Sequence, residues 1–406
     1  MHAERADVVI VGGGIIGSCV AYYLARAGQD VVVLDPAPGD GSSKANAGII
    51  CASYCLPMAN PDSLRAGLAI LRGGHGPLSF RRPLPPRTLA WLVRFTVACR
   101  PGRAWQDAAR LHQLACRSQD LYEELAGSEQ LDLQLRGGGW TYVFHDPDGL
   151  RRHARLAERL ATVGVRHSIL GLDELLDREP SVAPTAAGAV FYPGDRVLNP
   201  GRTTGEVARA AMKRGARFIA EAVTEADRRD GRVSRVFTQR RAIAADWFVI
   251  AAGARSRAVG QRFGVRLPVA AGHGISLTLP APGQPLINGA LMAGDEHVVI
   301  SPAADYIRIT SGMEFGADGA PDPSPSAVAR MRAAAERTVP ALRELTGRGE
   351  PWRGARPMTP TGVPFIGAVA RNVVAATGHN TLGMTLGPVT GQLVSDLITQ
   401  QKPTRR

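Results

Sequence analysis

The chain has 406 residues, of which 45% are hydrophobic and 21% are charged, as in soluble globular proteins. This length exceeds what one hydrophobic core supports and predicts two or three domains. Lysine and arginine outnumber aspartate and glutamate by 48 to 36. The arginines form no long basic run, however, and aromatic residues reach only 5%, so nucleic-acid binding is not expected.

The first predicted unit is a strand, a turn, a helix and a second strand. The β-branched run 7–11 predicts a buried parallel strand, and residues 18–27 predict an amphipathic helix. The second strand covers residues 31–34 and ends at Asp35. An acid about 20 residues beyond the turn is placed to accept hydrogen bonds from a ribose.

The turn of this unit has the pattern G-x-G-x-x-G. Glycines at its fixed places let the backbone approach a pyrophosphate, and the helix that follows supplies oriented N–H groups. The pattern alone is weak, but here it follows a strand and opens a helix. It predicts a dinucleotide site that includes Gly12, Gly14, Ile15, Ile16 and Gly17.

The loop after Asp35 is rich in small and hydroxyl residues. Such a segment suits contact with a phosphate or a flat ring, and it also suits a polar surface loop. On the first interpretation, the cofactor-contacting residues are Ser42, Ser43, Asn46, Ala47 and Gly48.

Residues 56–130 predict a helical insertion whose first half is interrupted by prolines. One helix starts near Thr88, and another covers residues 107–126. The aromatic side chains between Trp91 and Phe95 favour core packing, with a membrane-contacting patch as the alternative.

The rest of the chain alternates strands and helices. The predicted helices cover 150–161, 200–214, 327–338 and 385–398. The predicted strands cover 139–144, 188–192, 216–219, 222–226, 233–238, 241–244, 247–250, 275–279, 298–300, 306–310 and 372–376.

A second predicted cofactor turn follows the strand 247–250. That strand ends in the small residues 251–256, which bring another backbone turn to the ligand. A site assembled from segments about 240 residues apart is more typical of a flavin protein than of a nicotinamide enzyme. The residues assigned to this part of the site are Val223, Ala252 and Gly253.

The five cysteines are odd in number and lie in apolar surroundings, so we expect reduced, packed thiols in a cytoplasmic protein. No zinc-site spacing is present, and no metal is predicted. We expect no signal peptide and no transmembrane segment. A peripheral contact with the inner face of the membrane stays open.

Several motifs along the full length resemble the D-amino-acid dehydrogenases and oxidases, with their glycine and sarcosine oxidase relatives. The most telling are Gly-Ala-Arg-Pro-Met-Thr-Pro at 354–360 and Gly-His-Asn-Thr-Leu-Gly at 378–383. Gly76-Pro77-Leu78 and Trp91-Leu92 look most like the dehydrogenase branch.

The resemblance implies non-covalently bound FAD. It also implies that Arg356 grips the substrate carboxylate, as a guanidinium fork can. The loop 46–48 would lie near the isoalloxazine. His379 would either pack beside the flavin or shape its turn. The backbone donors near the ring would come from Gly378, His379, Asn380, Thr381, Leu382 and Gly383.

Two departures from the family pattern affect the site. Asp35 stands where many relatives carry Glu, which shortens the ribose contact. Ile275 stands where several relatives have a Tyr, so Tyr306, Arg308 or His273 would substitute for it. The predicted catalytic residues are therefore Arg356, Tyr306 and His273.

The predicted fold class is α/β. A Rossmann-like FAD-binding domain with a small β-meander would cover residues 1–60, 198–268 and 352–406. An interleaved α+β substrate domain, with a mixed and largely antiparallel sheet, would cover residues 61–197 and 269–351.

The predicted function is oxidation of the Cα–N bond of an amino acid, most of all a D-amino acid, by hydride transfer to flavin N5. The imino product would hydrolyse to a 2-oxo acid and ammonia. The chemistry needs positioning more than an acid or base. The electron acceptor would be oxygen, a quinone or another protein. The alternatives are a glycine- or sarcosine-type or cyclic amino acid oxidase, a tailoring amine oxidase, and a flavin-bearing subunit of an electron-transfer complex.

Overall fold

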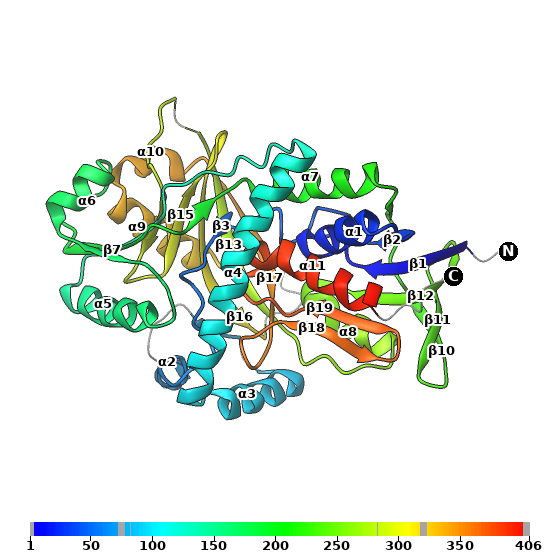
Figure 1. Cartoon of the computed structure of the whole chain (residues 1–406). Coiled ribbons are helices and arrows are strands. Elements are labelled where there is room, and N and C mark those ends of the chain that lie inside the picture. Colours follow the sequence, from blue (N-terminus) through cyan, green and yellow to red (C-terminus); the bar gives the residue numbers. More distant parts are fainter. Residues whose placement is uncertain (1–3, 72–77, 82, 282, 317–322, 401–406) are drawn as a thin grey trace.

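The computed structural model describes residues 4–71, 78–81, 83–281, 283–316 and 323–400. Of the dehydrogenase-like stretch, Gly76 and Pro77 lie outside these residues. Two large sheets organise the described chain, and the helices pack on and between them (Figure 1). This arrangement confirms the predicted α/β fold.

The first sheet has a parallel centre in the order β9-β2-β1-β12-β19. Its β-branched strands are buried on both faces, as parallel strands usually are. A β10–β11 hairpin and β18 extend it in antiparallel fashion. Its strands are β1 (Glu4–Val11), β2 (Val31–Leu34), β9 (Arg217–Ile219), β10 (Glu225–Arg229), β11 (Arg232–Phe237), β12 (Ala242–Ile250), β18 (Phe365–Ala370) and β19 (Val373–Thr377).

The second sheet has the order β17-β13-β16-β15-β14-β5-β7-β6, and β4 joins β16. All of its pairings are antiparallel except β14–β5 and β16–β4. Its strands are β4 (Leu78–Phe80), β5 (Trp140–Phe144), β6 (Ser168–Leu170), β7 (Gly188–Tyr192), β13 (Ala270–Pro280), β14 (Ala290–Ala293), β15 (Val298–Pro302), β16 (Tyr306–Phe315) and β17 (Glu350–Met358). A separate small pair joins β3 (Ile49–Ile50) to β8 (Arg196–Val197).

Helices cover the sheets on opposite sides. On the first sheet, α1 packs against both α7 and α11, and α4 packs on α11 beyond them (Figure 1). On the second sheet, α9 covers the face that points away from the first. The helices are α1 (Ile15–Arg26), α2 (Pro61–Leu71), α3 (Pro86–Ala98), α4 (Pro101–Glu129), α5 (Pro147–Ala161), α6 (Leu172–Arg178), α7 (Pro200–Lys213), α8 (Ser256–Arg262), α9 (Pro325–Thr338), α10 (Arg343–Thr346) and α11 (Gly383–Gln400), with 3₁₀ turns η1 (Gly253–Arg255) and η2 (Pro340–Leu342).

Several details differ from the sequence-based expectation. The strand predicted at 222–226 forms instead at Glu225–Arg229, where it pairs with β11. The segments 241–244 and 247–250 form one strand, β12 (Ala242–Ile250), because Ala245 continues its pairing with β1 at Ala6 and Asp246 stays in the strand. The strand β17 belongs to the second sheet, although residues from 352 onward were assigned to the FAD-binding domain. Its backbone pairs with β13 from Glu350 to Met358, so the chain returns to the first sheet only after β17. The other domain boundaries remain a prediction.

Over the described residues, no helix combines the length and apolarity needed to cross a bilayer. All five cysteines are free thiols, and four of them are buried. Burial raises the pKa of the Cys19, Cys51 and Cys55 thiols, which keeps them protonated and unreactive.

Candidate functional site

The glycine-rich turn after β1 touches the turn after β12 through backbone alone. A Cβ at Gly12, where φ is +116°, would lie 2.6 Å from the carbonyl carbon of Ala251. A Cβ at Gly17 would lie 2.9 Å from the carbonyl carbon of Gly12. The Ala251 N–H donates to the Val11 carbonyl at 2.9 Å. The two turns predicted to share a ligand are therefore adjacent, and only glycine permits that packing.

The N-terminus of α1 opens at this junction. The Ser43 hydroxyl accepts from the Ile15 N–H at 3.1 Å, and no acidic residue occupies the first turn of the helix. The Asp35 carboxylate accepts from the N–H groups of Gly13 and Ala37, each at 2.8 Å. Free N–H groups at a helix end favour an anion, and Asp35 is fixed beside them.

The loop 42–48 is held to the second sheet and to the residue after β8, so it is more than a polar surface loop. The Ser42 hydroxyl donates to the Ala355 carbonyl at 2.9 Å, and the Ser301 hydroxyl donates to the carbonyl of Ala47. The Gly48 carbonyl accepts from the Leu198 N–H at 2.8 Å. Within the loop, the Asn46 side chain accepts from the Gly48 N–H at 2.8 Å. The loop is thus a rigid bridge over the junction of the two sheets.

Arg356 lies on β17, and its side chain crosses the neighbouring strand β13. It pairs with Gly272 on β13, and its guanidinium passes over Gly274 to donate to the Gly312 carbonyl at 2.7 Å. A Cβ at Gly274 would lie 2.6 Å from the Arg356 Cζ, so the absence of a side chain there makes room for the arginine.

The Arg356 guanidinium is half-buried, and no carboxylate of the described chain lies within 4 Å of it. By contrast Arg353, on the same strand, pairs with Glu314 at 3.0 Å. Desolvation lowers the pKa of Arg356, which nevertheless stays a cation at any physiological pH. The site therefore holds a positive charge that an incoming carboxylate can neutralise.

The turn 378–383 is bonded directly to the end of β17. The Asn380 N–H donates to the Pro357 carbonyl at 3.0 Å, and the Asn380 side-chain oxygen accepts from the Thr359 N–H at 2.8 Å. Gly383 then begins α11. These two bonds tie the turn that begins α11 to Pro357 and Thr359, which closely follow Arg356 in the chain.

His379 is buried, with 2% of its surface exposed, and its Nε2 lies 2.9 Å from the Thr390 hydroxyl. Burial lowers the pKa of its imidazole to about 3. The Leu382 N–H donates to its carbonyl at 2.8 Å. These contacts join the turn to α11, which agrees with the turn-shaping interpretation of this residue.

Tyr54 was not among the predicted residues, and it lies near Arg356. Burial raises the pKa of its phenol, whereas the positive charge of Arg356 lowers it. Its ring packs against Trp140 at 5.7 Å between centroids, and 42% of the residue stays exposed. The preceding loop is fixed by buried Asp195, which accepts from the Ala52 N–H at 2.9 Å and from the Ser53 N–H at 3.1 Å. Tyr54 therefore lies on a rigid loop, with its phenol within electrostatic reach of Arg356.

Arg308 is a second cation on the same face of the second sheet. On β13, Gly272 pairs with Arg356 and Thr278 pairs with Arg308, and positions an even number apart share a face. Only 7% of Arg308 is exposed, and it approaches the Lys44 carbonyl at 3.5 Å and the Tyr306 ring at 4.8 Å.

No carboxylate of the described chain lies within 4 Å of Arg308 either, and its Nε has no hydrogen-bond partner. Desolvation lowers its pKa. A buried, unpaired cation is costly, so this guanidinium is suited to an anionic or electron-rich ligand beside the loop 42–48.

The remaining predicted residues are more dispersed. The Tyr306 hydroxyl donates to Asn199 at 3.3 Å, next to Arg308 and away from Arg356. His273 alternates with Gly272 and Gly274, which places it on the opposite face of β13 from the Arg356 guanidinium. Val223 is buried, and its carbonyl accepts from Arg262 at 2.6 Å. The structure therefore does not bring the three predicted catalytic side chains together.

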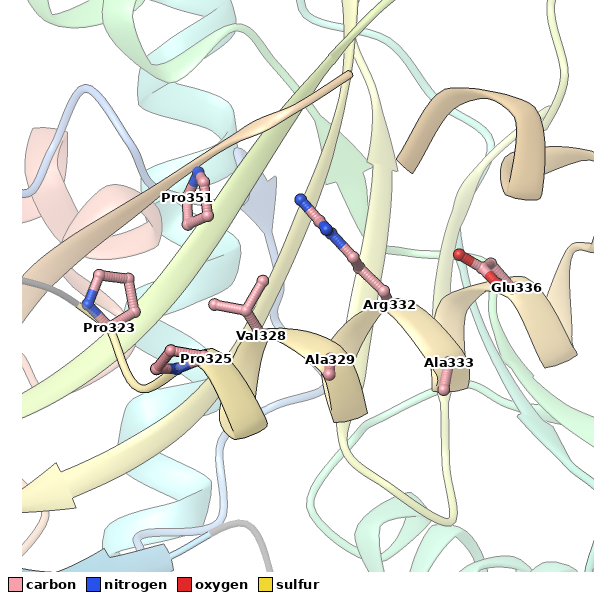
Figure 2. Close-up of a pocket in the computed structure, with 8 residues that line it drawn as sticks. All are labelled: Pro323, Pro325, Val328, Ala329, Arg332, Ala333, Glu336 and Pro351. Carbon is pink, nitrogen blue, oxygen red and sulfur yellow. The ribbon is translucent and has the colours of Figure 1, made fainter. Parts of the chain in front are cut away.

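A separate hollow of about 620 Å³ lies between α9 and the start of β17. Figure 2 shows Arg332 and Glu336 among its lining residues, with Val328 and Pro351. The Arg332 guanidinium already donates to Gly349, and Glu336 already accepts from Thr346. None of the predicted site residues lines it. No group of three potential metal ligands occurs in the described ranges either.

The model of one protein family, described as FAD dependent oxidoreductase, matches residues 7–397. The chain belongs to this family. Two relatives named D-amino acid dehydrogenase are similar along their whole length. The protein of Methylobacterium sp. (strain 4-46) is 32% identical over 408 residues, covering 98% of this chain and 96% of the relative. The protein of Vibrio cholerae serotype O1 (strain ATCC 39541) is 30% identical over 406 residues, covering 97% and 95%.

Solved structures agree on the fold. The glycine oxidase of Bacillus cereus ATCC 14579 superposes with a TM-score of 0.76 at 22% identity, covering 98% of this chain and 96% of that one. The glycine oxidase of Geobacillus kaustophilus gives 0.75 at 24% identity, covering 99% and 96%. The predicted family, fold and FAD dependence are thereby confirmed.

The residues at the junction fit FAD. The close-packed glycines place no side chain between the backbone and the α1 N-terminus, where a pyrophosphate binds well. The buried Arg308 Nε and Ser276 hydroxyl, both without hydrogen-bond partners, face the same junction. Unsatisfied buried polar atoms of this kind are expected where a ligand completes the site.

The glycine packing at the dinucleotide turn can be tested at Gly17. We expect Gly17→Ala to lose FAD and to lower the melting temperature, because its Cβ would overlap the Gly12 backbone. Gly205→Ala on α7 is the control, since no atom lies within 4 Å of its added Cβ; it should keep FAD and gain up to about 1 kcal/mol of stability. Flavin absorbance and thermal unfolding measure both. Full FAD occupancy in Gly17→Ala would contradict the close approach.

The space over Gly274 can be tested in the same way. Gly274→Ala should displace the Arg356 guanidinium, because the added Cβ meets only the end of that long side chain, and leave the fold and FAD in place. We expect KM for a carboxylate substrate to rise about 10- to 100-fold, the effect of losing a charged hydrogen-bonded contact. Gly283→Ala is the matched control, because its Cβ would meet nothing within 4 Å. An unchanged KM in Gly274→Ala would show that Arg356 does not depend on this space.

The buried His379 predicts a pH effect on stability. Its folded-state pKa of about 3 lies below the ordinary 6.5, so the fold favours the neutral ring. The stability it contributes is complete above about pH 6.5 and is lost as the pH falls toward 3. We expect His379→Gln to reduce the fall in the free energy of unfolding across this range, measured by urea denaturation. The same pH dependence in variant and wild type would show that a group other than His379 titrates in this range.

Proposed function

We propose that this protein is an FAD-dependent dehydrogenase that oxidises the Cα–N bond of a D-amino acid. The observation that carries the proposal is Arg356, a cation without an ion partner that is fixed beside the cofactor turn. Relatives at 30–32% identity named D-amino acid dehydrogenase support this substrate class.

We assign the cofactor contacts to the residues of the junction. The turn 12–17 and the α1 N-terminus would hold the pyrophosphate, and Asp35 would accept hydrogen bonds from the ribose. Ala252, Gly253 and Val223 would complete the nucleotide end. The loop 42–48 and the turn 378–383 would hold the flavin end.

The chain's own residues supply binding and orientation. Arg356 binds the substrate carboxylate through parallel N–H···O bonds, and Tyr54 stands near enough to steady it. The amino group reacts in its neutral form, since among the described residues no carboxylate lies within 4 Å of the Arg356 guanidinium to take a proton. The bound FAD supplies the acceptor for the Cα hydride. The imino acid then hydrolyses in water to a 2-oxo acid and ammonia.

The electron acceptor is the second part of the proposal. We propose a quinone or a partner protein in preference to oxygen, with the enzyme in peripheral contact with the inner face of the membrane. Dye or quinone reduction without peroxide release would support this; stoichiometric peroxide under air would identify an oxidase.

The substrate assignment is tested with a panel of D- and L-amino acids, glycine, sarcosine and proline, by following flavin bleaching without oxygen. We expect D-amino acids to bleach the flavin fastest. Preference for glycine or sarcosine would replace the D-amino acid assignment. Bleaching by none of them would favour an electron-transfer subunit.

The role of Arg356 is tested by substitution. Arg356→Ala should raise KM for the best substrate about 100-fold or more, because a buried charged pair is lost, while FAD stays bound. Arg356→Lys should recover only part, since an ammonium lacks the planar fork. Arg343→Ala, at an arginine side chain that is 78% exposed, is the control and should change nothing. Wild-type kinetics in Arg356→Ala would show that Arg356 does not bind the substrate carboxylate.

A further inference from the structure

The positive charge of the chain is concentrated in one segment. Residues 63–106 contain eight arginines and no aspartate, glutamate or lysine, so this segment of 44 residues carries a formal +8 of the total +12. Arg72 and Arg82 of this set lie outside the described residues. The segment includes α2 after Asp62, all of α3 and the start of α4.

Helix α3 turns opposite faces to the protein and to solvent. Thr88, Trp91 and Phe95 are its buried residues, and the last two stack at 5.5 Å. The helix is tied down by the Trp91 indole N–H, which donates to the Met358 carbonyl at 3.0 Å. The predicted core role of Trp91 and Phe95 is therefore confirmed, and neither ring is part of an exposed patch.

The outer face of α3 is apolar and exposed. Leu89, Val93 and Val97 follow one another at intervals of four residues and expose 49%, 64% and 59% of their surfaces. Within the described residues only nine large hydrophobic side chains are exposed, so one helix face holds a third of them. A stripe of this kind is not expected on a face that meets only water.

Arginines surround this stripe. Arg87 and Arg94 are exposed on α3, and Arg100 and Arg103 follow it, also exposed. Arg94 and Arg100 have no carboxylate within 4 Å among the residues placed in the structure. In Figure 1, α3 lies with α2 at one edge of the molecule, where a flat surface can reach it.

We propose that the outer face of α3 docks on a lipid bilayer that contains anionic headgroups. Leu89, Val93 and Val97 would enter the boundary between headgroups and acyl chains, and the arginines would meet the lipid phosphates. Nucleic acid would use the arginines but leave the aliphatic stripe in water. The segment 63–106 contains no acidic residue, although Arg103 pairs with Asp107 just beyond it at 3.5 Å. Its net positive charge matches an anionic surface better than a second copy of this cationic chain.

The docking surface adds a membrane partner to the proposed function, and its biological role rests on that function. The Trp91–Met358 hydrogen bond joins the membrane-facing helix to the end of β17, two residues from Arg356. A lipid-soluble electron acceptor would thus be met on the side of the protein that carries the substrate arginine.

The test is co-sedimentation of the FAD-loaded protein with vesicles of phosphatidylcholine, with or without phosphatidylglycerol. We expect binding only to the anionic vesicles and weaker binding as salt rises. Val93→Glu should weaken binding about tenfold or more, because it removes a buried aliphatic group and adds a repelled charge. Met212→Glu, on α7 and 44% exposed, is the matched control and should bind like the wild type.

Three other outcomes overturn the proposed docking surface. Equal binding to both vesicle types would remove the role of the arginines, and normal binding of Val93→Glu would remove the role of α3. A wild-type dimer in solution that Val93→Glu converts to monomer would assign this face to a second copy. Turnover with a soluble dye should be equal in all variants. If the wild type binds the vesicles but shows no turnover with the dye, the proposed function is refuted and the docking surface is not.

Discussion

Hydrogen bonds of Asn380, which lies between β19 of the first sheet and α11, join that segment to the end of β17 in the second sheet. One bond joins the Asn380 N–H to Pro357, and the other joins its side chain to Thr359. Because Arg356 precedes Pro357 directly, the arginine proposed to bind substrate and the turn 378–383 share one short connection. A hydride transfer depends on such positioning, since small displacements of the reacting atoms cost large factors in rate.

Two desolvated guanidinium groups at the site have no ion partner among the described residues. Arg356 and Arg308 both lose water without gaining a carboxylate, whereas Arg353 has Glu314. An ion pair at either position would stabilise the free protein and compete with the ligand. Leaving both guanidinium groups unpaired gives up stability in exchange for affinity toward a carboxylate and the cofactor.

The backbone part of the site was predictable, and the side-chain part was only partly so. The turns at Gly12 and Ala251 could be related because a strand–turn–helix motif fixes where parallel strands end. Gly274 gave no signal, since its clash with Arg356 depends on the register between β13 and β17. Tyr54 was missed because its approach to Arg356 comes from a loop anchored by a buried Asp195. On α3, helical spacing indicated the core face at Trp91 and Phe95, but burial was needed to show that the opposite face is uncovered.

The interleaving of the chain has a consequence for biosynthesis. The cofactor turn at 12–17 is among the first segments made, whereas the turn 378–383 and α11 come after both sheets. On the assignment of the flavin contacts proposed above, a nascent chain cannot complete the flavin end of the site until this last segment has been made. Retention of FAD would therefore indicate that the whole chain has folded. A chain that fails to bind FAD would leave the junction of the two sheets incompletely folded and open to quality-control proteases.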